Sequence, residues 1–323
     1  MTPSETAHND PSRSGRVRFA TFNVLHGRPM ADGRPVSVPA GSGPEAPFVR
    51  AVVSLDADVL ALQELDRLQE RSGGVDQASA AAAGSGAPYW RYASAFHGVA
   101  KAAGGWVPEP SEPGLRVYGP GDVGDGVPSH GIALLSRLPV RHWRARRLSP
   151  APVPMPLRTP GRRGLTASRD QPRAALAAVL EGSRGPFTVV ALHLSFVPGW
   201  NIRQLLTVRA WIADLPRPQV LLGDFNLPGA LPRAVLAAPG PFRGSGLQWT
   251  RRTRRTRRNR RGDTPPPRGW RDLARTPTYP AHRPLVQLDH VLAIGLSAGA
   301  AGAAHTPNTA ISDHRPLALE LPL

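Results

Sequence analysis

Short apolar runs recur along the chain, and several lead into a single polar residue with a chemically useful side chain. Apolar runs of about four to eight residues, bounded by turn residues, are typical of buried strands. Ligands meet open α/β sheets at the carboxyl ends of strands, so we expect the polar residues after these runs to lie at one edge. The runs with the residues that follow them are 17–22 with Asn23, 58–63 with Glu64, and 187–192 with His193.

The stretch 220–226, Val-Leu-Leu-Gly-Asp-Phe-Asn, is the one around which the rest of the chain is organised. Three apolar residues lead into Gly223, and Asp224 and Asn226 follow two positions apart. A strand has a side-chain period of two, so we expect both polar groups on one side. Together they supply a charged acceptor and an amide donor, which suit the activation of water and the stabilisation of an oxyanion.

The remaining pattern predicts strands alternating with short helices. Helices are expected at 48–55, from Ile202 to a stop before Pro216, and at 231–237. Strands are expected at 131–135 and 141–148 as a hairpin, at 173–180 next to 187–192, at 286–293 with Asp289 in its interior, and at 316–321. Residues 68–129 show little order, and 150–171 is expected to form a loop.

Composition limits the classes of protein. At 323 residues the chain can form one large domain, which we place at 16–323, and the polar residues 1–15 are expected to be a disordered tail. No apolar run approaches the ~20 residues that a membrane span needs. The chain has no cysteine, which excludes disulfides and thiolate metal sites. These features favour a cytoplasmic monomer without a membrane span.

The net charge is +17, and the run 251–261 alone contributes eight positive charges. The rest of the chain carries +9. This run lies in a predicted surface insertion at about 239–275, and arginine runs bind phosphate backbones without sequence recognition. A genome rich in G and C also favours arginine, so the run has a second explanation that needs no ligand. The candidate nucleic-acid-binding residues are Arg251, Arg252, Arg254, Arg255, Arg257, Arg258, Arg260 and Arg261.

Six short motifs occur along the chain: Thr21-Phe-Asn23, Leu62-Gln-Glu64, His193-Leu, Gly223-Asp-Phe-Asn226, Leu288-Asp289-His and Ser312-Asp-His314. Taken together, they resemble the endonuclease/exonuclease/phosphatase superfamily, which includes type I deoxyribonuclease, apurinic-site endonucleases, inositol-polyphosphate phosphatases and neutral sphingomyelinases. They occur in the order of that superfamily and extend from about residue 16 to residue 323. The resemblance implies an α/β fold, a four-layer sandwich of two packed mixed β-sheets flanked by helices.

The resemblance also implies a metal-dependent phosphoesterase, in which Mg²⁺, with Mn²⁺ as a substitute, is bound by oxygen ligands. Glu64 would be the principal carboxylate ligand, Asn23 a neutral oxygen ligand, and Asp313 a ligand at the same ion or behind it. The ion would polarise the phosphate and offset the negative charge that develops on it.

The catalytic roles are implied in the same way. Asp224 would be the base that orients and activates water, and Asn226 would donate to a non-bridging phosphate oxygen. His314 would contact the phosphate while Asp289 holds its imidazole, and His193 would be a second phosphate contact.

Two other functions remain open. Gly295-Leu-Ser297-Ala-Gly299 fits the letters of a serine-hydrolase elbow, with Asp313 and His314 later in the chain. That elbow requires a helix after the serine, and the sequence after Ser297 lacks helical periodicity. A non-catalytic nucleic-acid-binding protein that uses the arginine run is the second alternative. Among phosphate esters, DNA, RNA, phosphoinositide, sphingomyelin and small phosphodiesters all remain candidate substrates.

Overall fold

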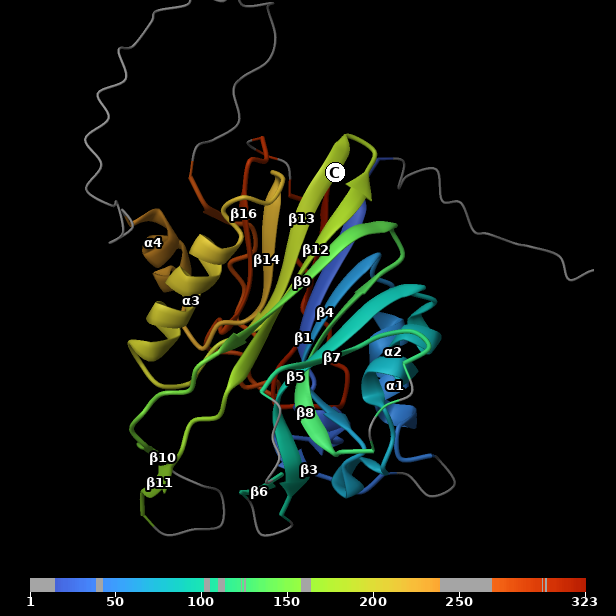
Figure 1. Ribbon diagram of the computed structural model, residues 1–323, viewed down its shortest axis with the longest axis vertical. Helices are drawn as coiled ribbons and strands as arrows, with labels where there is room; N and C mark the ends of the chain where they lie inside the picture. Colours follow the sequence, from blue (N-terminus) through green and yellow to red (C-terminus); the bar gives the residue numbers. More distant parts are fainter. Residues whose placement is uncertain are drawn as a thin grey trace, which may run out of the picture.

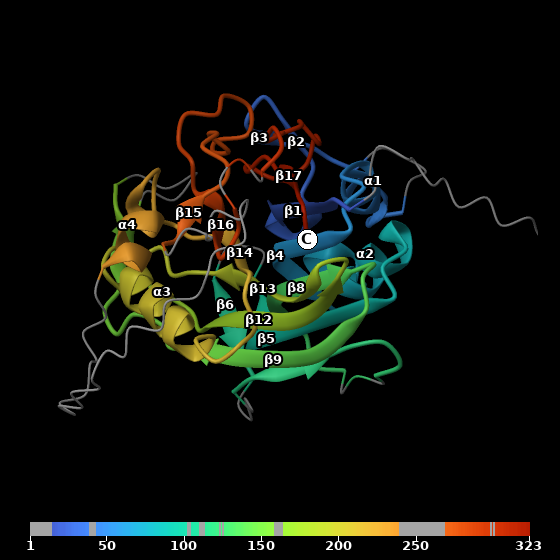
Figure 2. The same cartoon turned by 90° about the horizontal axis from the view of Figure 1, so that it is seen from above.

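Two mixed β-sheets pack face to face, and helices cover their outer faces (Figures 1 and 2). The computed structural model describes residues 15–323 apart from 39–42, 102–104, 110–113, 123, 125, 158–163, 239–268, 298 and 300. The arrangement has four layers, helices–sheet–sheet–helices. It confirms the α/β sandwich of two packed mixed sheets that the sequence predicts.

The first sheet has seven strands within the described residues. Its parallel pair is β1 with β4, and the other neighbours run antiparallel. In spatial order the strands are β17 (Leu317–Leu321), β1 (Val17–Asn23), β4 (Val59–Arg67), β8 (Ser129–Ser136), β5 (Tyr89–Ala100) and β6 (Trp106–Pro108), with β7 (Arg116–Tyr118) also paired to β5.

The second sheet has six strands in the described part of the chain, again with one parallel pair, β13 with β14. In spatial order they are β15 (Arg271–Asp272), β16 (Asp289–Ile294), β14 (Gln219–Asp224), β13 (Gly185–His193), β12 (Arg173–Gly182) and β9 (Val140–Leu148). Two small ribbons lie outside the large sheets: β2 (Met30–Ala31) with β3 (Arg34–Pro35), and β10 (Met155–Leu157) with β11 (Thr166–Ser168).

Helices α1 (Ala46–Ser54) and α2 (Gln77–Ser85) pack on the first sheet, and α3 (Trp200–Trp211) and α4 (Leu231–Ala237) on the second. Three apolar cores fill the spaces between the four layers. Strand β1 shows why its sequence alternates, since Phe19 enters the core between the sheets while Phe22 enters the core beneath α1. No helix in the described residues is long and apolar enough to cross a membrane.

Two predictions about the strands are wrong. Residues 68–129, predicted to have little order, contain α2 and the twelve-residue strand β5, which lies inside the first sheet. Most of β5 is buried, and small residues such as Ala93 and Ser94 interrupt any apolar–polar alternation. Residues 141–148 form β9, but β9 pairs with β12 in the second sheet and not with β8, because the chain crosses between the sheets after β8.

Several predicted boundaries also differ from the structure. Strand β4 continues past Glu64 to Arg67 through a bulge between Leu62 and Leu65. Strand β14 ends at Asp224, so Asn226 lies beyond it, and β16 begins at Asp289, not at residue 286. At the end of the predicted insertion, Trp270 is buried in the core beneath α3, and β15 pairs with β16. Residues 269–275 therefore belong to the packed fold.

Gly223 is required where β14 approaches β13. It has a φ of 150°, and a Cβ at this position would overlap the carbonyl oxygen of Leu192. We expect Gly223→Ala to lower the free energy of unfolding by roughly 3–4 kcal/mol, because neither backbone can move away within a buried sheet. Chemical denaturation would measure this effect.

Gly229 is the matched control, since its φ is also positive, at 56°, but a Cβ there would meet nothing within 4 Å. Gly229→Ala should therefore show only the conformational cost of ~1–2 kcal/mol. Equal losses in the two variants would contradict a steric requirement at Gly223.

Candidate active site

The ends of the two central strand pairs bring the predicted site residues together between the sheets. Strands β1 and β4 lie parallel, with Asn23 opposite Gln63, and β13 and β14 lie parallel, with His193 opposite Asp224. Asp224 is in turn paired with Asp289 at the start of β16. The loop before β17 contributes Asp313 and His314. The sequence prediction that separate polar residues would meet at one edge therefore agrees with the geometry.

Three backbone positions around this edge lie in the left-handed region of φ. Glu64, Asn226 and Ser312 have φ values of 58°, 49° and 65°. Such conformations are unfavourable for residues other than glycine and persist where the surrounding structure fixes them, often at functional sites. At Glu64 the cause is the bulge in β4. At Ser312 the hydroxyl group donates to the carbonyl of Asn23 at 2.6 Å and fixes the loop.

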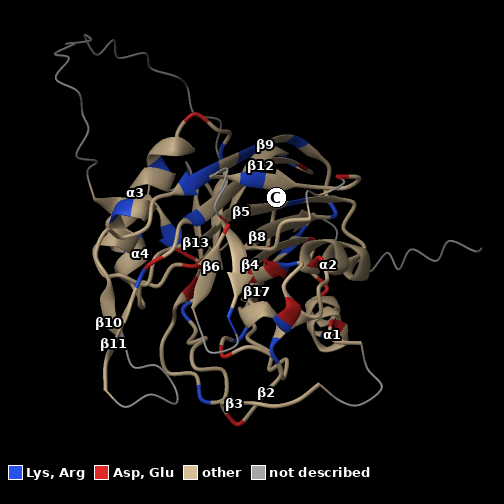
Figure 3. Cartoon of the chain, turned by 60° about the horizontal axis from the view of Figure 1, so that its bottom comes forward, with Lys and Arg blue, Asp and Glu red and all other residues tan. Residues whose placement is uncertain are grey.

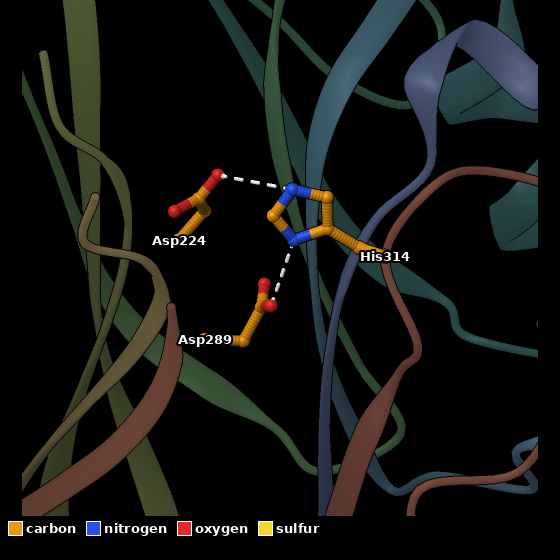
Figure 4. Close-up of side chains that lie close together, drawn as sticks. All are labelled: Asp224, Asp289 and His314. Carbon is orange, nitrogen blue, oxygen red and sulfur yellow. Dashed lines mark hydrogen bonds and ion pairs between the residues drawn. The ribbon is translucent and has the colours of Figure 1, made fainter. Parts of the chain in front are cut away.

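Asp224, Asp289 and His314 form the buried centre of the site (Figure 4). Nδ1 of His314 lies 2.8 Å from Oδ2 of Asp289, and its Nε2 lies 3.9 Å from Oδ2 of Asp224. Thr278 donates to the same Asp289 oxygen at 2.6 Å. The imidazole is therefore held at Nδ1, and its other nitrogen faces the carboxylate of Asp224.

Burial determines much of the protonation of this centre. Burial raises the pKa of Asp224 to about 6; the charge of His314 opposes this effect and that of Asp289 adds to it. Burial lowers the pKa of His314, but the carboxylates of Asp289, Asp224 and Asp313 outweigh it and raise that pKa to about 10. At neutral pH the pair is a carboxylate able to accept a proton and an imidazolium able to stabilise an anion.

Glu64 and Asp313 form the more open part of the site, next to the buried Asn23. The side chain of Glu64 is 25% exposed, whereas that of Asp224 is 3% exposed. Burial opposes ionisation of Glu64, but His130, Arg173 and a hydrogen bond from Asn23 lower its pKa overall. Burial raises the pKa of Asp313 against the effect of His314, and the charge of Glu64 raises it further.

These residues are suited to a hard cation. A divalent ion would relieve the mutual repulsion of the Glu64 and Asp313 carboxylates, and oxygen ligands are those that Mg²⁺ prefers. Asp224, Asp289 and His314 also lie close enough to share an ion. However, Oδ2 of Asp289 is already engaged by His314 at 2.8 Å and by Thr278 at 2.6 Å, so the partly exposed Glu64 is the better metal ligand.

Asn23 links the two parts of the site. Its Nδ2 donates to Glu64 at 3.1 Å and to Asp224 at 3.0 Å, while its Oδ1 accepts from the backbone of Leu25. The sequence analysis expects Asn23 to be an oxygen ligand, whereas in this arrangement its nitrogen faces both carboxylates. Asn23 therefore holds Glu64 and Asp224 at a fixed separation.

His193 lies between the same two carboxylates. Its Nε2 is 3.6 Å from Asp224 and 4.0 Å from Glu64, while Arg173 Nη1 is 3.2 Å from its Nδ1. Burial, Arg173 and the neighbouring histidines lower the pKa of His193 well below its usual value. Arg173 Nη1 also lies 3.3 Å from Nε2. A neutral imidazole with its hydrogen on Nε2 would present that hydrogen towards Asp224 and Glu64.

Asn226 is positioned by three hydrogen bonds. Its backbone nitrogen donates to Asp224, its Nδ2 donates to the carbonyl of Leu194, and its carbonyl accepts from Asn201. The second hydrogen of Nδ2 remains available for a substrate oxygen. Because Asn226 lies beyond the end of β14 at a positive φ, the strand period of two does not explain its position.

Four polar residues near the site were not predicted from the sequence: Asp66, Arg71, His130 and Arg173. Asp66 lies two residues after Glu64 on β4 and is paired in the sheet with His130 on β8. The apolar run ends before Glu64, and β4 reaches Asp66 only beyond the bulge between Leu62 and Leu65. Neither the bulge nor the pairing with β8 was visible in the sequence, since both depend on the register between distant segments.

The serine-hydrolase alternative at Ser297 does not agree with the structure. Ser297 follows the carboxyl end of β16, whereas Asp289, which contacts His314, begins that strand. A strand of this length spans ~20 Å, so Ser297 cannot share His314, and the serine-hydrolase alternative is wrong.

The arginine run that the second alternative uses, residues 251–261, lies outside the described residues. Of the described arginines (Figure 3), Arg141 and Arg144 on β9 pair with Glu181 and Asp214.

The fold and site define an α/β sandwich protein whose strand ends surround a carboxylate, a histidine–aspartate pair and an open acidic cluster. Residues 20–314 match the Endonuclease/Exonuclease/phosphatase family, and the chain belongs to this family of phosphoester hydrolases. The resemblance seen in the sequence motifs is confirmed. No curated protein matches the chain.

Solved structures share the fold at low sequence identity. An endonuclease/exonuclease/phosphatase from Beutenbergia cavernae is 18% identical, with a TM-score of 0.51 and coverage of 95% of this chain and 71% of that one. The corresponding protein from Bacteroides vulgatus is 15% identical, with a TM-score of 0.54 and coverage of 95% and 98%. A family protein from Leptotrichia buccalis is 12% identical, with a TM-score of 0.51 and coverage of 94% and 99%. At these identities the likeness establishes the fold alone.

Proposed function

We propose that the protein hydrolyses a phosphate ester by attack of water, with Asp224 as the base and a divalent metal ion at Glu64. The observation that carries this proposal is the position of Asp224. It is a buried carboxylate with a raised pKa, and it lies between an open acidic cluster and an imidazolium. A base works best when its pKa lies near the working pH, and burial brings Asp224 into this range.

Asp224 accepts a proton from the attacking water. Its Oδ1 accepts from the backbone of Asn226 and its Oδ2 from Asn23, so the carboxylate is fixed in orientation. These two donors leave further lone pairs for a water molecule. Because the carboxylate is already oriented, little reorganisation energy is needed when it accepts the proton.

His314 stabilises the negative charge that builds on the phosphate. Its Nδ1 donates to Asp289, and the charge of this carboxylate keeps the ring protonated. Nε2–H therefore points at the space beside Asp224. Asn226 and the neutral His193 add further N–H donors from the second sheet, and such preorganised donors are the main source of stabilisation in reactions of this kind.

Glu64 and Asp313 would hold the metal ion, with Asn23 setting the distance from Glu64 to the base. When bound, a divalent ion supplies Lewis-acid polarisation of the phosphate and offsets its charge. Mg²⁺ and Mn²⁺ fit an oxygen donor set of this kind.

Removal of the metal provides a direct test. We expect EDTA to abolish hydrolysis of bis-p-nitrophenyl phosphate and added Mg²⁺ or Mn²⁺ to restore it. We expect Glu64→Gln to weaken Mn²⁺ binding at least about 10-fold, measured by electron paramagnetic resonance without any substrate, because a charged ligand is replaced by a neutral amide.

Asp214→Asn is the control, since Asp214 is an exposed carboxylate paired with Arg144 on the outer side of the second sheet. This variant should bind Mn²⁺ like the wild type. Full activity in EDTA, or unchanged Mn²⁺ binding by Glu64→Gln, would contradict the proposed metal site.

A further inference from the structure

A second group of polar and aromatic side chains lies beside Glu64 and has no part in the chemistry described above. Asp66 is fully buried and accepts two hydrogen bonds from Arg71, at 2.7 and 2.8 Å, and lies 2.8 Å from Nδ1 of His130. The indole of Trp106 packs against both partners, 4.7 Å from the Arg71 guanidinium and 5.3 Å from the His130 ring. We call these four residues the Asp66 cluster.

The Asp66 cluster is next to the proposed reaction centre. Asp66 follows Glu64 by two residues on β4, a separation of ~7 Å along a strand. His130 also lines a small cavity together with Arg173 and His193. A group esterified to a phosphate at Glu64 and Asp224 would therefore reach the Asp66 cluster without any movement of the chain.

The hydrogen bonds to Asp66 fix which atoms remain for a ligand. Nδ1 of His130 lies 2.8 Å from the Asp66 carboxylate, and in the tautomer with the hydrogen on Nδ1 the other ring nitrogen, Nε2, presents a lone pair. Arg71 uses Nε and Nη2 on Asp66, and no described residue accepts a hydrogen bond from its Nη1 or pairs with His130 Nε2. Nη1 of Arg71 is thus a donor and Nε2 of His130 an acceptor, and both residues lie beside the partly exposed indole of Trp106.

We propose that the Asp66 cluster binds a polyhydroxylated ring, so that the substrate is the phosphate ester of a sugar or a cyclitol. A hydroxyl group accepts from Arg71 and donates to His130 at the same time, which neither a phosphate oxygen nor an apolar group can do. The indole of Trp106 packs against the C–H face of the ring. This inference rests on the proposed hydrolysis and names the substrate class of that site.

The charge of the cluster argues against a second phosphate as its ligand. The Asp66 carboxylate neutralises Arg71 through a two-point ion pair, and Glu64 adds a further negative charge nearby. Asp66 is fully buried while the side chain of Arg71 is 32% exposed, so the pair fixes the guanidinium with one side towards the surface. The pair therefore orients Arg71 and His130 for binding.

The test compares two kinds of ester in the same enzyme. We expect the wild type with Mg²⁺ to have a higher kcat/KM for a hexose 6-phosphate or an inositol phosphate than for p-nitrophenyl phosphate. Arg71→Met and His130→Asn should lower kcat/KM for the hydroxylated substrate about 10–100-fold, the effect of losing a hydrogen bond to a charged or buried group. Arg71→Met should leave hydrolysis of bis-p-nitrophenyl phosphate within about 3-fold of wild type, because Arg71 contacts neither the metal ligands nor the base.

Arg144→Met is the matched control, because Arg144 makes the same two-point pair with Asp214 and its side chain is also 32% exposed. It should change neither activity. Free myo-inositol should compete with bis-p-nitrophenyl phosphate in the wild type, and this measurement needs no variant to fold.

The outcomes separate the two proposals. Equal losses on both esters in Arg71→Met, or no competition by inositol, would overturn the ring-binding inference while leaving the hydrolase intact. A preference for a polynucleotide over every ring phosphate would overturn it in the same way. If the wild type with Mg²⁺ hydrolyses none of these esters, the proposed function itself fails.

Discussion

We expect Asp224→Asn to lower kcat/KM for every phosphate ester by about 10³-fold, within the range of about 10²–10⁴ that a general base contributes. The substitution retains the shape of the side chain but removes the lone pair and charge that accept the proton. The backbone of Asn226 can still donate to the amide oxygen at position 224. We therefore expect a folded protein whose loss is in kcat and not in KM, measured by steady-state kinetics.

The pH dependence follows from the same residue. The pKa of Asp224 is raised to about 6, so the base is deprotonated above this pH and protonated below it. Activity is therefore present at neutral pH and is lost as the pH falls through about 6. Asp214→Asn, at an exposed carboxylate on the opposite side of the second sheet, should retain both the rate and the profile. Wild-type turnover by Asp224→Asn would show that another group activates the water.

The sequence predicted those elements whose apolar pattern is local. Helix α4 has the predicted bounds of residues 231–237, and β12 and β13 pair as predicted around their short turn. The partner of β9 could not be predicted, because an apolar pattern defines the buried face of a strand but not the sheet that it joins. Strand β5 was missed because burial on both faces removes the alternation that identifies a strand.

The sequence motifs predicted which residues belong to the candidate site, but not how these residues contact one another. Motif order placed Glu64, Asp224 and His314 together, but the amide nitrogen of Asn23 between two carboxylates depends on how two sheets pack. The same holds for Asp66, because both the bulge that carries β4 past Glu64 and the pairing with His130 depend on register between distant segments. Residues that act through cross-strand contacts are therefore the ones that sequence motifs miss.

His314→Gln should lower kcat/KM by about 10²–10³-fold, because the imidazolium that stabilises the phosphate is lost. Its pH profile should also change in a way that simple misfolding would not produce. The charge of His314 is the largest influence that lowers the pKa of Asp224. Without it, the acidic limb of the residual activity should move above its wild-type position at about pH 6.

Asp289→Asn tests whether Asp289 acts through His314. Asp289 holds Nδ1 at 2.8 Å and keeps the ring charged, so its loss should lower the rate less than the loss of the imidazole itself. In the double variant with His314→Gln, the loss should be close to that of His314→Gln alone, since residues that act as a unit are not additive. Additive losses would indicate that Asp289 acts independently, for instance as a ligand of the metal ion.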